Sequence, residues 1–74
     1  MSRLPVVSGR DAVRAFQKVG YQLSHQSGSH IILRHESPPH RHLSIPNHAE
    51  PAKGTLRGLI GDAGLTVDEF VALL

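Results

Sequence analysis

The sequence predicts an α+β fold, a two-layer α-β-β-β-α(-α) sandwich in which helices cover one face of a three-stranded antiparallel sheet. The apolar residues have helical spacing up to Gly20, follow strand-like patterns up to Pro46, and return to helical spacing from Lys53. The connections between the extended segments are short, which favours an antiparallel meander. The chain has 74 residues and no cysteine, so we expect a single domain over residues 1–74 whose core uses nearly all of its apolar side chains.

The first helix is predicted over residues 9–19. Ser8 has the position of an N-cap residue, with Asp11 three residues later, and Gly20 follows the helix where a C′ glycine is common. The buried face is marked by apolar residues at helical spacing, namely Ala12, Ala15, Phe16 and Val19. Basic residues recur every four positions on the opposite side, at Arg10, Arg14 and Lys18. One face of this helix is therefore expected to pack, and the other to be basic.

The first strand is predicted directly after Gly20, where the spacing changes to a period of two. Tyr21, Leu23 and His25 alternate with polar residues, so these three side chains are expected to share one half-buried face. The Ser27-Gly28 pair then favours a turn.

Two further strands are predicted, over residues 29–35 and 42–45. Pro38-Pro39 separates them, and Pro46 ends the second one. The apolar residues at 31–33 are consecutive, so periodicity leaves open which face of the sheet carries His30.

Helical spacing returns over residues 53–63, and Gly64 ends it. Three glycines within this segment, Gly54, Gly58 and Gly61, each lower helix stability by roughly 1 kcal/mol relative to alanine. We therefore expect tertiary packing to hold the helix, and a close backbone approach to explain at least one of these glycines. Thr66, followed by Glu69, predicts a capping box at the start of a last short helix.

The charge distribution favours an anionic partner. All eight lysines and arginines and three of the six acidic residues lie in residues 1–57, a net charge of +5, whereas residues 58–74 carry −3. All six histidines lie between His25 and His48 and add positive charge below neutral pH. Nucleic acid is the commonest partner of such a basic chain. The apolar runs are too short for a membrane span or a secretory signal, so we expect the cytoplasm.

Four short motifs resemble the HicA family of toxin ribonucleases from toxin–antitoxin modules. They are Gly28-Ser29-His30, Ile45-Pro46-Asn47-His48, Lys53-Gly54-Thr55-Leu56-Arg57 and Ala63-Gly64-Leu65. Their order and spacing match the family over nearly the whole chain. The resemblance implies a fold like the double-stranded RNA-binding domain, metal-independent cleavage of mRNA, and neutralisation by a HicB-like antitoxin. On this matching, His30 corresponds to the catalytic histidine and His48 to a second histidine position of the family.

The chemistry expected of His30 follows from RNA itself. A ribonuclease needs a base for the 2′-hydroxyl proton, an acid for the leaving 5′-oxygen, and positive charge for the transition state, and histidine near neutral pH suits the first two tasks. The small residues Gly28 and Ser29 would let a phosphodiester approach closely. Spacing alone favours a histidine that only fills a half-buried strand surface, and the resemblance favours the catalytic interpretation. His48 is a candidate proton partner or phosphate ligand, with a loop histidine that hydrogen-bonds the backbone as the alternative.

The candidate phosphate-binding residues are basic. Lys53 and Arg57 are four residues apart, so they share a helix face near an N-terminus whose amides also favour anions. Further candidates to bind the RNA backbone are Arg34 and Arg41, which flank the second predicted hairpin, and Arg10 and Arg14 on the first helix. Basic residues on a helix are also commonly no more than a solvated face.

No metal and no other cofactor is expected. His40 and His42 would lie on one side of an extended chain, but a closed zinc site needs about four ligands and the chain has no cysteine. We interpret His25 and His35 as surface residues. Two of the three aromatic residues are expected in the core, which leaves no platform for stacking bases and favours recognition of RNA by shape and backbone.

Three functions remain open at this level. The first is a metal-independent endoribonuclease toxin that acts through His30 and is silenced by a HicB-like antitoxin. The second is a non-catalytic RNA-binding module of the same fold. The third is an interaction protein that only holds an acidic partner.

Overall fold

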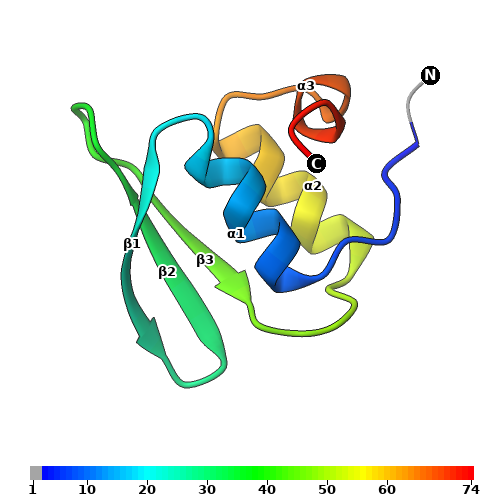
Figure 1. Cartoon of the computed structure of the whole chain (residues 1–74), viewed down its shortest axis with the longest axis horizontal. Coiled ribbons are helices and arrows are strands. Elements are labelled where there is room, and N and C mark those ends of the chain that lie inside the picture. The colour runs from blue at the N-terminus through cyan, green and yellow to red at the C-terminus, as the bar shows by residue number, and fades with distance from the viewer. Residues whose placement is uncertain (1–2) are drawn as a thin grey trace.

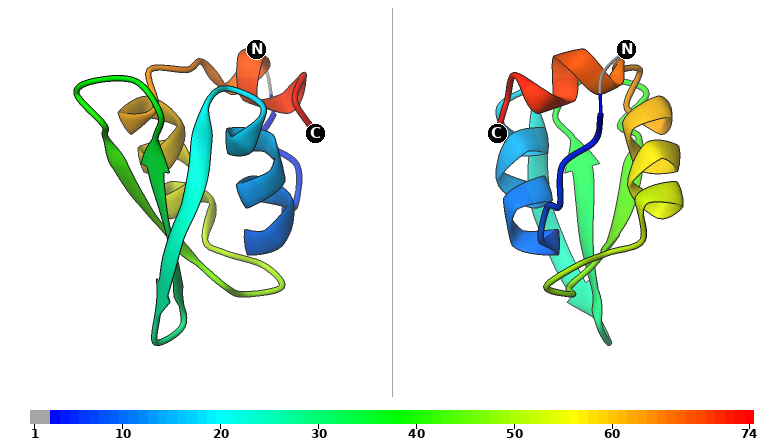
Figure 2. Two further views of the ribbon diagram at one scale, coloured as in Figure 1. Left: turned by 60° about the vertical axis from the view of Figure 1, so that its left-hand side comes forward. Right: turned by 90° about the vertical axis from the view of Figure 1, so that its right-hand side faces the viewer.

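The computed structural model describes residues 3–74 and confirms the predicted order of elements (Figure 1). The elements are α1 (Gly9–Gln17), β1 (Tyr21–Ser27), β2 (His30–His35), β3 (His42–Pro46), α2 (Lys53–Asp62) and α3 (Val67–Val71). The strands pair antiparallel in the order β1-β2-β3. All three helices lie on one side of the sheet, which confirms the two-layer α+β sandwich (Figures 1 and 2).

Helix α1 begins as predicted and ends two residues earlier than predicted. The Ser8 hydroxyl accepts a hydrogen bond from the Asp11 backbone N–H at 3.1 Å, which caps the first turn. After Gln17 the chain tightens, because Lys18 and Val19 donate to the carbonyls three residues back at 3.1 and 3.0 Å. Gly20 then takes φ +100°, a left-handed conformation that glycine adopts at low cost, and turns the chain into β1.

The core lies between the sheet and the helices. Its largest fully buried side chains are Phe16, Phe70, Leu33, Leu43, Ile45, Leu56 and Ile60. The ring of Phe16 on α1 lies 5.1 Å from that of Phe70 on α3 and 5.9 Å from that of Tyr21 on β1. Tyr21 is buried as well, so all three aromatic residues belong to the core and the expectation of two was too low.

A β-bulge in β1 overturns the predicted alternation. Leu23 pairs with Leu33 and His25 pairs with Ile32, and the register shifts between the two pairs. Directly opposite residues share a sheet face, so the extra residue turns Leu23 towards the helix side and His25 to the other side. Leu23 nevertheless stays 59% exposed, because β1 is an edge strand. The prediction that Tyr21, Leu23 and His25 share one half-buried face is therefore wrong.

The close backbone approach predicted within α2 is found at a different glycine. A Cβ atom added at Gly54, Gly58 or Gly61 would meet nothing within 4 Å, so the prediction for these positions is wrong. A Cβ atom at Gly9, the first residue of α1, would instead overlap the carbonyl oxygen of Pro46. Gly9 thus lets the start of α1 pack directly against the end of β3.

Helix α3 is short and starts at the predicted capping box. The Glu69 backbone N–H donates to the Thr66 hydroxyl at 3.1 Å, and the Thr66 N–H donates to the Glu69 carboxylate at 2.9 Å. This reciprocal pair satisfies two amides that the helix leaves free. Among residues 3–74, none of the helices combines the length and the apolar character required to span a bilayer.

His35 is a structural residue, contrary to the prediction that it is a surface residue. Its Nδ1 accepts a hydrogen bond from the Ser37 N–H at 3.0 Å, so its Nε2 is the atom that donates to the Val19 carbonyl, at 2.9 Å. The ring is half-buried and meets the Tyr21 ring edge to face at 4.8 Å. The cause is the tight turn at Gly20, which brings the end of α1 against the end of β2. His25 is exposed, as predicted.

Candidate active site

The candidate site lies at the end of the sheet where the β1–β2 turn meets the end of β3. Ser27 pairs with His30, so Gly28 and Ser29 form a two-residue turn in which Gly28 has φ +57°. His30 is the first residue of β2 and lies opposite Pro46 of β3. The Asn47 backbone N–H donates to the Ser29 carbonyl at 2.7 Å, which fixes the turn to the loop that follows β3.

The burial pattern along β2 shows which face of the sheet carries His30. Ile31 and Leu33 are buried against the helices, so His30, Ile32 and Arg34 lie on the opposite face. We call this face, which no helix covers, the outer face of the sheet (Figure 2). His30 is exposed, and none of the side-chain hydrogen bonds among residues 3–74 involves its imidazole. Its ring is thus accessible to a substrate.

His48 lies in the loop that leads from β3 to α2, as predicted, and it is exposed. Its carbonyl oxygen accepts a hydrogen bond from the Gly9 N–H at 2.8 Å. Together with the bond from Asn47 to Ser29, this contact holds the loop between the start of α1 and the β1–β2 turn. The structure therefore brings Gly28, Ser29, His30 and His48 to one end of the sheet.

Arg34 lies on the outer face with His30 and is exposed. The two residues are four positions apart, about 13 Å along the strand at about 3.3 Å per residue. Arg34 therefore does not touch the group that His30 would touch, but it can contact an extended ligand that runs along β2.

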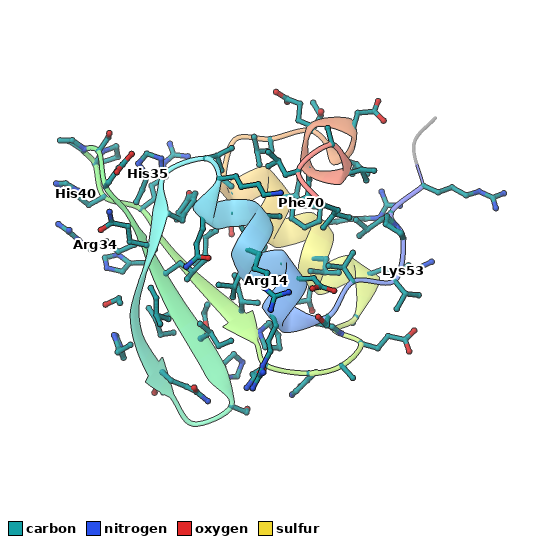
Figure 3. All side chains as sticks on the ribbon, in the orientation of Figure 1. Arg14, Arg34, His35, His40, Lys53 and Phe70 are labelled. Carbon is teal, nitrogen blue, oxygen red and sulfur yellow. The ribbon has the colours of Figure 1, made fainter. Side chains whose placement is uncertain are left out.

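Lys53 and Arg57 share the exposed surface of α2, as predicted. Figure 3 shows that Lys53 and Arg34 lie on opposite sides of the molecule. The predicted phosphate-binding residues thus form two separate groups. The first turn of α2 contains no acidic residue, and its N-cap residue Ala52 makes no side-chain hydrogen bond to the helix, so the first amides remain available to an anion.

The register reveals neighbours of Arg34 that the sequence analysis missed. Gln22 of β1 and His42 of β3 lie directly opposite Arg34, one on each side. His42 could have been placed there from the pattern of β3, because Leu43 and Ile45 are its apolar residues and the intervening positions face outward. Gln22 could not, because its pairing depends on the bulge.

His40 and His42 do not form the pair that an extended chain would give. His40 has φ +58°, and its Nδ1 lies 3.1 Å from the carbonyl oxygen of His35, within the turn between β2 and β3. The expected arrangement on one side of the chain is therefore wrong. No cluster of three or more histidine or acidic side chains within residues 3–74 has the geometry to hold a metal ion.

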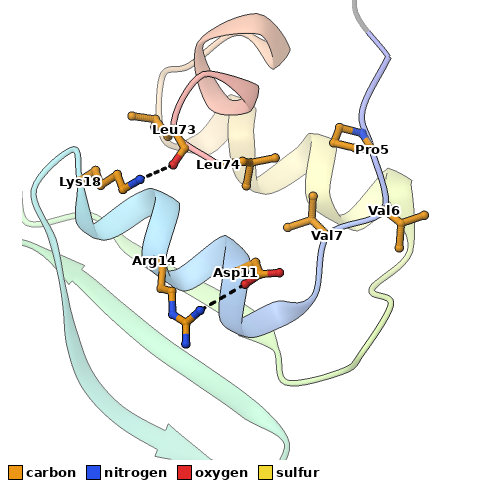
Figure 4. Close-up of a pocket in the computed structure, with 8 residues that line it drawn as sticks. All are labelled: Pro5, Val6, Val7, Asp11, Arg14, Lys18, Leu73 and Leu74. Carbon is orange, nitrogen blue, oxygen red and sulfur yellow. Dashed lines mark hydrogen bonds and ion pairs between the residues drawn. The ribbon is translucent and has the colours of Figure 1, made fainter.

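A cavity of about 470 Å³ lies in the helix layer, away from these residues (Figure 4). It opens between the N-terminal segment, α1 and the C-terminus, and the Lys18 ammonium donates across it to the Leu73 carbonyl at 2.7 Å. Its lining is Pro5, Val6, Val7, Asp11, Arg14, Lys18, Leu73 and Leu74. Of the residues predicted to bind RNA, only Arg14 belongs to this lining.

Comparison with known proteins identifies the family. The family model described as HicA toxin of bacterial toxin-antitoxin matches residues 9–65, from the start of α1 to just before α3. A comparison with curated proteins finds no match. The matched segment covers well over half of the chain and includes all of the residues predicted for the site. The chain therefore belongs to the HicA family, the toxin components of bacterial toxin–antitoxin modules.

Proposed function

We propose that this toxin is a metal-independent endoribonuclease that cleaves mRNA with His30 as its catalytic residue and is neutralised by a HicB-like antitoxin. The observation that carries the proposal is the position of His30. Its exposed imidazole lies on an uncovered sheet face, next to a turn of two small residues, Gly28 and Ser29. A phosphodiester can approach such a site without displacing any part of the fold.

In the proposed reaction, the neutral His30 imidazole takes the proton from the 2′-hydroxyl of the nucleotide before the scissile bond. The 2′-oxygen attacks the phosphorus, the bond from phosphorus to the 5′-oxygen breaks, and the leaving oxygen takes up a proton. The products are a 2′,3′-cyclic phosphate and a free 5′-hydroxyl. His48 is the proposed proton donor or phosphate ligand, because its loop is fixed to the turn that precedes His30.

The basic residues are proposed to hold the RNA by its phosphates and not by its base sequence. Arg34 would contact the RNA on the outer face of the sheet. Lys53 and Arg57 would bind a phosphate at the start of α2, where free amides and the helix dipole add to their charge.

The antitoxin is proposed to act by covering His30. The sheet end is exposed, and the three described strands contain no Asp or Glu, so an acidic chain of complementary shape would block substrate access and proton transfer together. Membership of a toxin family supports the existence of such a partner.

The experiment is to compare the wild-type protein with His30→Ala, both expressed without an antitoxin, and to follow growth and the integrity of mRNA. The purified proteins are then incubated with an RNA oligonucleotide and with its fully 2′-O-methylated copy. We expect cleavage of the unmodified RNA only, with cyclic-phosphate ends, and a rate at least about 10²-fold lower for His30→Ala. An equally toxic His30→Ala variant, or cleavage of the methylated copy, would contradict the mechanism.

A non-catalytic RNA-binding module is the second candidate. It is favoured by the absence, within residues 3–74, of a side chain hydrogen-bonded to the His30 ring that would orient it. Such a module would bind RNA in a salt-dependent way and leave it intact in the same assay.

A further inference from the structure

The outer face of the sheet presents its side chains in cross-strand rows. One row is Gln22, Arg34 and His42, because Arg34 pairs with both of the others. The next row is His25, Ile32 and Ser44, and the row after it contains His30 between Ser27 and Pro46. Successive rows are about 6.6 Å apart, since they are separated by two residues of β2.

Positive and neutral groups alone form this face. None of the residues of the three described strands is Asp or Glu. The charged or titratable side chains that face outward are His25 on β1, His30 and Arg34 on β2, and His42 on β3. The acidic residues nearest in sequence are Glu36, after β2, and Glu50, in the loop after β3.

Arg34 and His42 are placed so that an anion bound between them would reduce the repulsion between their positive charges. Opposite residues of antiparallel strands have Cβ atoms about 4.5–5.5 Å apart, and like charges at that distance are destabilising. The guanidinium is always charged, so protonation of the imidazole creates such a like-charge pair. A phosphate bound between the two groups would compensate both charges, and the Gln22 amide adds a donor on the other side of Arg34.

We infer that the RNA strand runs along β2 over the outer face, with one phosphate at His30 and a second at the row formed by Gln22, Arg34 and His42. This inference rests on the proposed function and adds the path of the substrate to it. The two rows are about 13 Å apart, so an extended single strand has to bridge them with the intervening nucleotides. Ile32 is half-buried between the two rows and offers an apolar surface for a base or a ribose.

The test is binding of a fluorescent, fully 2′-O-methylated single-stranded RNA, which the proposed reaction cannot cleave. Dissociation constants are measured over a series of salt concentrations for the wild type, Arg34→Gln and a control, Arg14→Gln. The control removes the same charge from α1, on the helix side of the sheet (Figure 2), where Arg14 is 74% exposed and pairs with Asp11 at 3.5 Å. It therefore also tests the alternative path of the RNA over α1. Loss of one phosphate contact lowers the slope of log K against log salt by about 0.7 for a single strand. We expect this reduction, and a several-fold loss of affinity, for Arg34→Gln alone.

The histidines give a second readout, because imidazoles change charge between about pH 5 and 8. Wild-type affinity is expected to increase several-fold from about pH 8 to about pH 6. His42→Gln is expected to lower affinity more at about pH 6 than at about pH 8, so that a large part of this increase is lost. The thermal unfolding of each variant confirms that the exposed substitutions leave the fold intact.

The outcomes separate the path of the RNA from the function. If the wild type binds and cleaves RNA but Arg34→Gln and His42→Gln behave like Arg14→Gln, the inferred path is wrong and the proposed function stands. If the wild type neither binds the methylated RNA nor cleaves the unmodified one, the proposed function fails and the inference with it. Salt-slope and pH effects confined to the outer-face variants would support the path even for a module that binds without cleaving.

Discussion

The backbone N–H of Asn47 donates to the carbonyl oxygen of Ser29 at 2.7 Å, and this bond joins the loop that carries His48 to the turn that precedes His30. The same loop is held from the other side by the hydrogen bond from Gly9 to the His48 carbonyl. The candidate site is therefore organised by backbone contacts between three segments that are distant in sequence. Gly9 is the residue that makes their close packing possible.

Gly9→Ala is expected to destabilise the protein by about 1–3 kcal/mol, because the added methyl group would overlap the Pro46 carbonyl oxygen and the backbone must move. Gly58→Ala is the matched control. It lies in α2 with open space around it, so it is expected to stabilise by roughly 0.5–1 kcal/mol through helix propensity. Chemical denaturation measures both changes. Equal effects of the two substitutions would show that the approach of α1 to β3 does not constrain position 9.

Leu23 and Leu33 lie directly opposite each other but differ in burial, with 59% and 0% of their surface exposed. Leu33→Ala is expected to cost about 2–5 kcal/mol, because it leaves a cavity in the core. Leu23→Ala is expected to change the free energy of unfolding by no more than about 0.5 kcal/mol. The comparison uses the denaturation midpoints of the two variants. A cost above that range for Leu23→Ala would mean that this edge leucine is buried in solution.

Leu23 also shows which feature of the fold could not be predicted from the sequence. The order of elements, the helix caps at Ser8 and Thr66 and the core positions were predictable, because each depends on local spacing. The bulge in β1 was not, because an extra residue in a strand leaves no mark on an alternating pattern and is fixed only by pairing with β2. The same error placed His25 on the wrong face.

The identity of the candidate site residues was predictable from the sequence, but their arrangement in space was not. The position of His30 after two small residues and of His48 after Pro46 could be read from the sequence. The face of His30, the row around Arg34 and the separation of Lys53 from Arg34 required the register and the packing of α2. The role of Gly9 could not be foreseen, since its only signal is a contact with Pro46, far away in the sequence.

The raised pKa of Tyr21 makes the stability of the protein depend on pH in the alkaline range. Burial raises the pKa of its hydroxyl above the ordinary value of 10.0; the Arg41 charge opposes this shift and Asp62 adds to it. The folded protein therefore keeps the proton at a pH where the unfolded chain has lost it. This contribution to stability is complete below about pH 10 and is lost as the pH rises through the folded pKa.

Tyr21→Phe is expected to remove this loss, so that the variant loses less stability than the wild type between about pH 8 and pH 11. The free energy of unfolding at the two pH values measures the difference. Tyr21 is the only tyrosine of the chain, so ultraviolet absorbance of tyrosinate gives its pKa directly. Arg41→Gln should raise that pKa further. An absorbance midpoint at or below 10.0 would contradict the burial argument.

Lys53 and Arg34 are expected to contribute independently to RNA affinity, because they lie on opposite sides of the molecule. The effects of Lys53→Gln and Arg34→Gln on binding free energy should therefore add to within about 0.3–0.5 kcal/mol in the double variant. The methylated RNA serves as the probe. Strong coupling between the two substitutions would mean that a single phosphate contacts both residues, and it would contradict the separation of Lys53 from Arg34 (Figure 3).

His30 and His48 are expected to behave in the opposite way, because they are proposed to act on the same reacting phosphate. His48→Ala should slow cleavage by about 10²–10⁴-fold if it donates the proton to the leaving oxygen. Residues that act as a unit are strongly non-additive, so the double variant should be no slower than His30→Ala alone. His48→Ala should also remove one limb of the pH dependence of cleavage. If the two effects multiply and the pH profile keeps both limbs, His48 is a phosphate ligand and another group donates the proton.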